Sequence, residues 1–116
     1  MPAILPEPMD VKIGDTFHYE AQWVDSTGAN VDLDGCTALM QFRESENEDP
    51  TLELSTENGL ITLAAGSISL DIPAATTKGL EEQYGMFDLE LTYSDGTVIT
   101  VLTGRYRILP DYAYLI

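Results

Sequence analysis

The sequence of 116 residues is poor in the residue types that build disulfides, zinc sites and nucleophilic catalysis. It contains one cysteine, Cys36, and one histidine, His18. A single cysteine excludes a disulfide within the chain and fits a reducing folding compartment. A zinc site or a nucleophile with its base needs further partners, and none is patterned with either residue. We therefore expect no catalytic residue, no metal and no cofactor, and so no enzymatic activity.

Basic residues and long apolar runs are also scarce. Five Lys and Arg stand against twenty Asp and Glu, which gives a net charge of −15. Affinity for nucleic acid comes largely from Lys and Arg at phosphates, so neither nucleic acid nor an anionic membrane is an expected partner. We favour the explanation that the acidic residues keep the protein soluble. The alternative explanation is an acidic face that meets a basic partner or binds cations.

The chain has no segment typical of membrane insertion or export. No apolar run reaches the roughly 20 residues that span a bilayer. The first ten residues lack the basic region and the apolar core of a signal peptide. We expect a soluble, single-domain protein made in the cytoplasm.

Two acidic clusters are candidates for oxygen ligands to calcium. One is Asp32 with Asp34, and the other is the acidic loop at 44–50. Neither cluster has the spacing of a calcium-binding loop, with its central glycine and terminal glutamate. We therefore favour the interpretation that both are solvated loops without a bound ion. A glycosidase pair needs two carboxylates in a cleft, for which a small sandwich leaves little room. The acids of the loop are Glu44, Glu46, Glu48 and Asp49.

β signals dominate what the sequence does contain. Residues 15–24 and 36–43 alternate apolar and polar side chains with a period of two, the pattern of half-buried strands. A turn follows the first of these segments at 25–29. The side chains predicted to face the core are Phe17, Tyr19, Ala21 and Trp23 in the first strand, and Cys36, Ala38, Met40 and Phe42 in the second.

The second half of the chain continues with short strands and turns. Residues 52–72 predict three strands joined by hairpin-length links, with Leu60 and Thr62 on one face of the middle strand. From Pro73 the sequence predicts one or two helical turns that end by Gly85. Asp95-Gly96 then predicts a tight hairpin. Val98, Leu102, Tyr106 and Ile108 are predicted to share one face of its last strand. Ile99 and Val101 make that strand apolar on both sides, as expected of a central or covered strand.

This pattern predicts an all-β fold. About seven strands with turns roughly every 8 to 12 residues favour an antiparallel Ig-like β-sandwich with one short helix. A small barrel is the main alternative. We divide the chain into an extended N-terminal arm at 1–14, a sandwich domain at 15–109 and a C-terminal tail at 110–116.

Both ends are candidate partner-binding segments. Pro2, Pro6 and Pro8 favour an extended arm whose apolar residues would be costly to expose. The tail is aromatic and aliphatic, whereas a free tail is normally polar. Packing on the same domain and docking on a neighbouring protein remain open for each end. The candidate contact residues are Ile4, Leu5, Met9, Tyr112, Tyr114, Leu115 and Ile116.

Four segments are distinctive in their composition and order. They are VDLDGCTALMQFRES (31–45), LSTENGLITL (54–63), IPAATT (72–77) and FDLELTYSDGTVITVLTG (87–104). Together they resemble small β-sandwich proteins of tailed bacteriophages, which are similar to the N-terminal domain of phage baseplate upper proteins. The resemblance covers roughly residues 15–109 and implies an Ig-like fold and a structural role in the virion. It implies no catalytic residues and does not reach the two ends.

The favoured function is a non-enzymatic structural protein of a tailed-phage virion. It would act as an adaptor in the tail, baseplate or fibre-attachment region, with other virion proteins as partners and an oligomeric state in the particle. One alternative is a capsid decoration protein that cements capsomers through its N-terminal arm. Another is a recognition module for carbohydrate or a host-surface ligand, which would need exposed aromatic residues in its loops.

Overall fold

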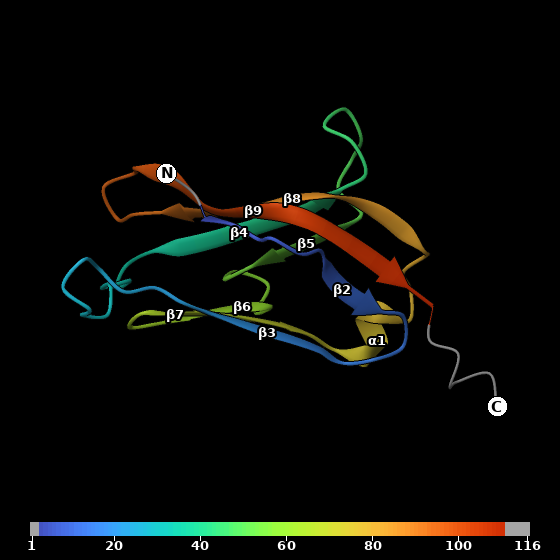
Figure 1. Ribbon diagram of the computed structural model, residues 1–116, viewed down its shortest axis with the longest axis horizontal. Coiled ribbons are helices and arrows are strands. Elements are labelled where there is room, and N and C mark those ends of the chain that lie inside the picture. The colour runs from blue at the N-terminus through green and yellow to red at the C-terminus, as the bar shows by residue number, and fades with distance from the viewer. Residues whose placement is uncertain (1–2, 111–116) are drawn as a thin grey trace.

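A computed structural model describes residues 3–110 as two β-sheets packed face to face (Figure 1). The larger sheet has the strand order β1-β9-β8-β4-β5, with β2 also paired to β9, and the smaller sheet has the order β3-β7-β6. The strands are β1 (Ala3–Ile4), β2 (Met9–Lys12), β3 (Phe17–Gln22), β4 (Thr37–Arg43), β5 (Leu52–Ser55), β6 (Ile61–Ala64), β7 (Ser67–Ile72), β8 (Gln83–Thr92) and β9 (Val98–Leu109), and α1 spans Ala74–Thr77.

This strand order is that of an Ig-like sandwich. β9, β8, β4 and β5 correspond to strands G, F, C and C′ of such a fold, and β3, β7 and β6 correspond to B, E and D. The predicted fold class is therefore confirmed: β3 to β9 are seven strands, and α1 is the short helix. Within residues 3–110, no helix is long and apolar enough to cross a bilayer.

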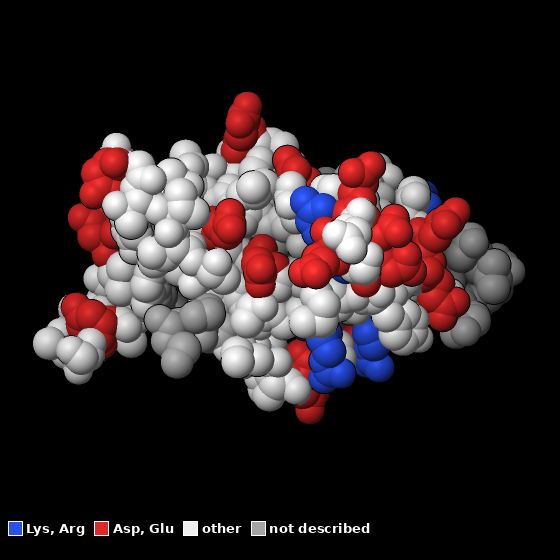
Figure 2. All heavy atoms as spheres, turned by 90° about the horizontal axis from the view of Figure 1, so that it is seen from above, with Lys and Arg blue, Asp and Glu red and all other residues white. Residues whose placement is uncertain are grey.

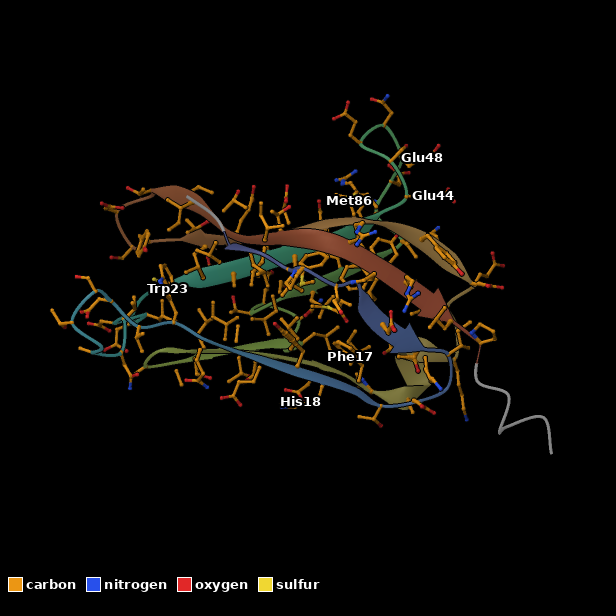
Figure 3. The ribbon with its side chains drawn as sticks, in the orientation of Figure 1. Phe17, His18, Trp23, Glu44, Glu48 and Met86 are labelled. Atoms are coloured by element: carbon orange, nitrogen blue, oxygen red, sulfur yellow. The ribbon has the colours of Figure 1, made fainter. Side chains whose placement is uncertain are left out.

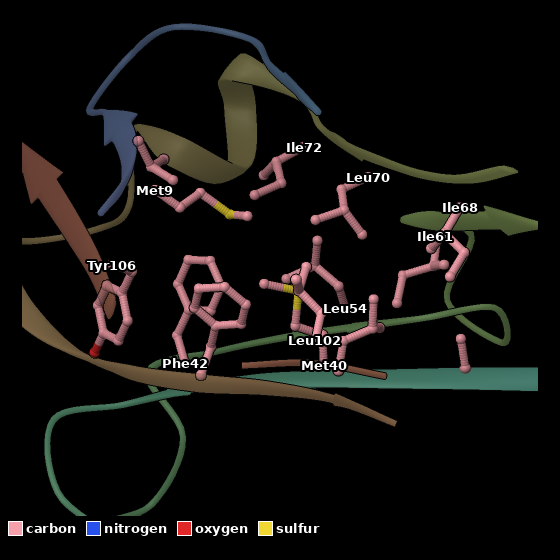
Figure 4. Close-up of a cluster of buried hydrophobic side chains, with 14 of the residues drawn as sticks. Met9, Met40, Phe42, Leu54, Ile61, Ile68, Leu70, Ile72, Leu102 and Tyr106 are labelled. Carbon is pink, nitrogen blue, oxygen red and sulfur yellow. The ribbon is translucent and has the colours of Figure 1, made fainter. Parts of the chain in front are cut away.

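The core lies between the sheets, where the predicted alternation places it (Figure 4). Even-numbered residues of β4 are buried, and odd-numbered residues of β3 turn inward while their neighbours are exposed. The rings of Phe42 and Tyr106 stack with their centroids 4.5 Å apart. The Tyr106 hydroxyl donates a hydrogen bond to Gln83, so this buried phenol has a polar partner.

The link between β5 and β6 is not the hairpin that we predicted. β5 pairs with β4 in the larger sheet and β6 pairs with β7 in the smaller one, so the chain crosses between sheets. Asn58 organises the crossing, because its Oδ1 accepts hydrogen bonds from the N–H groups of Ser55 and Leu60, both at 3.0 Å. After the crossing, Ile61 faces the core, whereas Thr62 is exposed and Leu60 only half-buried.

The hairpin at Asp95-Gly96 is confirmed, but a bulge alters the strand that follows it. Gly96 has a φ of +91°, as the tight turn requires, and β8 and β9 pair on either side. Val101 is an extra residue of β9 relative to β8. The bulge moves the alternation by one position, so Ile99 packs against the core, whereas Val98, predicted to share a face with Leu102, is 54% exposed.

Gly85 lies inside β8 and does not end the helical segment, which stops at Thr77. A Cβ at position 85 would lie 2.2 Å from the carbonyl oxygen of Arg43 and 2.7 Å from the ring of Tyr106. Glycine is needed there because the backbone of β8 passes directly against its neighbours.

The N-terminal arm forms an edge of the larger sheet. β1 and β2 run parallel to β9, with Ala3 opposite Leu102 and Lys12 opposite Leu109. Pro6 lies between these two strands, where a missing N–H interrupts no ladder. The larger sheet thus includes strands that precede residue 15, and the described part of the arm folds onto its own domain.

Candidate interaction site

The structure separates the predicted partner contacts of the arm from one another. Ile4 is 73% exposed at the sheet edge. Leu5 is half-buried against the core, and its N–H donates to the carbonyl oxygen of Thr103 at 3.0 Å. Met9 is only 6% exposed and belongs to the core, so it is not available to a partner in this fold. The predicted tail contacts Tyr112, Tyr114, Leu115 and Ile116 lie outside the described residues.

A bidentate ion pair between Asp10 of β2 and Arg107 of β9 holds the arm on β9. Arg107 donates from Nε and Nη2 to the two carboxylate oxygens of Asp10, at 2.7 and 2.8 Å. The hydrogen bond and the charge of Arg107 lower the pKa of Asp10, and the same pairing raises the pKa of Arg107. Next along the arm, the N–H of Ile13 donates to the carbonyl oxygen of Leu109 at 2.8 Å.

Thr77 of α1 fastens the turn that carries the chain from β2 to β3. Its side chain is fully buried. The hydroxyl donates to the carbonyl oxygen of Asp15 at 2.8 Å and accepts from the N–H of Gly14 at 3.1 Å. One buried hydroxyl thus satisfies backbone groups of the segment that joins the two sheets.

The outer face of the larger sheet carries a shallow depression of about 440 Å³. Met86 is 53% exposed there, and Leu39 is half-buried on the same outward side. Arg43 lies beside them, with Nη2 donating to Gln41 at 2.7 Å and Nη1 donating to the backbone of Glu48. Figure 3 shows Met86 on this face near the loop that carries Glu48.

Acidic side chains gather around this depression. Figure 2 looks onto the outer face of the larger sheet, and its Asp and Glu side chains crowd the end that carries the β4–β5 loop. Asp88 and Glu90 of β8 contribute to the lining, as does Glu46 of the loop. The result is a small apolar centre with an acidic rim, a composition suited to protein contacts.

Sequence reasoning did not select Leu39 or Met86 as contact residues. The signal was present, because Leu39 interrupts the alternation of its strand and Met86 occupies an outward position of β8. Only the assembled sheet places these residues on one face: β4 pairs with β8 so that Met86 lies opposite Arg43 and Leu39 opposite Glu90.

The groups considered for chemistry lie apart from one another. His18 contacts Asp71 at 2.6 Å on the exposed side of the smaller sheet, while Cys36 is half-buried. Asp32 accepts a hydrogen bond from the N–H of Asp34 at 3.0 Å, which makes a local turn. Among residues 3–110, no group of three or more His, Cys, Asp or Glu residues is arranged to hold a metal ion.

Comparison with known proteins gives a distant structural likeness. No family model and no curated protein matches the chain. Among solved structures, extracellular domains 3–5 of Drosophila OTK match 92% of this chain and 37% of that chain, with 14% sequence identity and a TM-score of 0.35. A likeness of this strength carries no functional information, and the Ig-like assignment rests on the strand order.

Proposed function

We propose that the protein is a non-enzymatic structural component of a tailed-bacteriophage virion. It joins other proteins in the tail, baseplate or fibre-attachment region of the particle. The observation that carries the proposal is the ordered set of four phage-type segments between residues 31 and 104. These segments supply β4, α1, the β8–β9 turn with the adjoining parts of both strands, and parts of β5, β6 and β7.

The outer face of the larger sheet is the proposed docking surface of the adaptor. Met and Arg are enriched at protein interfaces, and Met86 and Arg43 meet on this face beside Leu39. The hydrogen bonds of Arg43 to Gln41 and to the β4–β5 loop hold its side chain in place before a partner binds. A side chain that is already ordered loses less conformational entropy on binding.

The two alternative functions receive less support from the described residues. Capsid decoration was based on an N-terminal arm that crosses to a neighbour, whereas residues 3–12 lie on β9 of the same chain. A carbohydrate-binding module would present aromatic rings in its loops. Tyr84 is exposed, but it lies within β8.

Particle incorporation tests this proposal. A tagged chain is expressed during infection of a host by a phage that encodes it, and purified particles are examined by quantitative mass spectrometry and immunogold labelling. We expect labelling at the tail and a copy number that is a small multiple of the tail symmetry. Absence from purified particles would refute the proposal, and labelling over the head at capsid-scale copy number would favour decoration.

A matched pair of variants tests the docking surface. Met86→Asp adds a charge to the depression, and Val98→Asp adds the same charge at an equally exposed position next to the β8–β9 turn. We expect Val98→Asp to enter particles normally and Met86→Asp to be depleted at least tenfold, since a buried unpaired charge is costly at an interface. Equal incorporation would show that the partner binds elsewhere.

A further inference from the structure

β3 is an edge strand with one open side. In the part of the chain that the structure describes, it pairs only with β7. The N–H of Trp23 donates to Gly66 at 2.8 Å, and alternation along an antiparallel ladder then directs the N–H and C=O groups of Tyr19 and Ala21 toward β7. The backbone groups of the residues between them point to the open side. These residues are His18, Glu20 and Gln22.

An apolar groove runs beside this open edge. It has a volume of about 400 Å³ and lies between the first part of β3 and the arm segment 5–9. Phe17 and Tyr19 line it from β3 and are only half-buried, while Leu5 lines it from the arm. Figure 3 shows Phe17 pointing between the sheets and His18 pointing away from them.

The groove and the edge lie where an Ig-like sandwich can hold one more strand. In such folds strand A pairs beside strand B in the smaller sheet, and B is β3 here. No described strand occupies that position, because the arm pairs with β9 instead. β3 also has no proline, and its pairing with β7 shows no bulge. A proline or a β-bulge would have hindered the addition of another strand at this edge.

The charges beside this path are negative. Glu7 lines the groove and Glu20 is exposed on β3. Asp71 is exposed on β7 next to it and contacts His18. A second copy of the chain is a poor occupant, because both copies carry −15. The chain's own residues 111–116 contain Asp111 and no Lys or Arg, so they do not complement these charges either.

We propose that the open edge of β3 binds an extended, basic segment of another polypeptide, which adds to the smaller sheet as a further strand. Its alternate apolar side chains enter the groove between Phe17, Tyr19 and Leu5. Its Lys or Arg side chains lie on the outer side near Glu20. Backbone hydrogen bonds provide the affinity, and the groove and the acids select the sequence. The inference uses only β3 and the arm and is independent of the virion proposal.

Hydrogen exchange with a synthetic peptide tests the proposal on the full-length, isotopically labelled protein. The probe is an end-capped peptide of alternating Val and Lys, about eight residues long and thus able to span β3 at ~3.4 Å per residue. In the free protein, the amides of His18, Glu20 and Gln22 should exchange much faster than those of Tyr19 and Ala21. At a peptide concentration about ten times its Kd, their exchange should slow about tenfold.

Two controls separate strand addition from charge attraction. A peptide of the same sequence that is N-methylated at every residue keeps the charges but loses its backbone donors, and it should give no protection. The variant Glu20→Pro removes the central one of the three outward N–H groups of β3 while leaving the ladder to β7 intact. It should bind the probe at least tenfold more weakly than Glu20→Ala, which removes the same charge but keeps that N–H. If Glu20→Pro does not fold, the N-methylated peptide on the unmodified protein makes the same comparison.

Three results would overturn the proposal. If the three outward amides of β3 are already protected in the free protein, the edge is covered by the same chain. Protection that rises with protein concentration would identify a second copy as the occupant. Equal protection by both peptides would show that charge alone attracts the probe.

Discussion

The edges of strands β9 and β3 lie on the same side of the sandwich but differ in whether another strand pairs with them. The edge of β9 is covered by β1 and β2, whereas the edge of β3 pairs with no other described strand (Figure 1). Both edges lie next to the same arm, which lines the groove beside β3 while it pairs with β9. One short segment can complete only one of the two sheets, so with the arm on β9 no strand within residues 3–110 covers the free side of β3.

Core contacts and charge explain why the arm covers β9. Parallel pairing there buries Met9 and Val11 between the sheets, and full burial of such side chains contributes about 1.5–3 kcal/mol each. The same register brings Asp10 onto Arg107. β3 contains Glu20 and no Lys or Arg, so it offers Asp10 no comparable ion pair.

The largest expected loss of stability comes from truncating Met9, a residue of β2 that packs in the core beside β9. Met9→Ala should lower the free energy of unfolding by about 2–5 kcal/mol, since a buried methionine leaves a cavity. Met86→Ala is the matched control, because Met86 is exposed on the outer face, and it should change stability by no more than about 0.5 kcal/mol. Urea denaturation measures both. Equal losses would mean that the arm does not contribute to the core.

A smaller effect is expected from loosening the turn between the two edges. Thr77→Val keeps the shape of the side chain but leaves the N–H of Gly14 without its hydroxyl partner. The free energy of unfolding should fall by about 1–3 kcal/mol. Thr76→Val, on the same helix and only partly buried, is the control and should be close to neutral. Thermal unfolding measures both variants. Equal Tm values would show that the Thr77 hydroxyl does not stabilise the turn.

The smallest expected effect comes from weakening the attachment of the arm to β9 while its buried residues stay unchanged. Asp10→Asn removes the ion pair with Arg107 and should lower Tm by less than Met9→Ala does. Pairing lowers the pKa of Asp10 in the folded protein, so its contribution is complete above the ordinary value of about 3.9. The contribution then disappears as pH falls through the lowered folded pKa.

The measurement is the difference in Tm between the unmodified protein and Asp10→Asn across pH and salt. The difference should be constant from neutral pH to about pH 5 and then shrink in more acidic solution. High salt should reduce it at neutral pH, because the pair is partly exposed to solvent. A difference that grows toward acidic pH would mean that the ion pair does not act as described.

Sequence reasoning succeeded where the determining interactions are local. The alternation in β3 and β4 and the hairpin at Asp95-Gly96 were all predicted correctly. It failed at Val98, because a bulge depends on how β9 meets β8. It failed at Gly85 for a similar reason, since the close approach of Arg43 and Tyr106 is invisible in the local pattern.

The candidate site was predicted only in part. The apolar residues of the arm were recognised as needing a partner surface. For Met9 that surface lies within the same chain, whereas Ile4 is the well-exposed member of the three predicted arm contacts Ile4, Leu5 and Met9. Neither the depression at Met86 nor the open edge of β3 could be predicted from the sequence. Both depend on which strands become neighbours.

By itself, the sequence determined the β-rich fold class, most strands and the side chains that face inward, because a period of two and turn residues such as Gly96 act within a few positions. Only the tertiary structure decided that the arm covers β9 and that, among the described strands, β3 pairs with β7 alone. That choice depends on contacts such as Asp10 with Arg107, which lie 97 positions apart. Pairing across such a distance is selected by burial and charge in the assembled sandwich, and no local pattern specifies it.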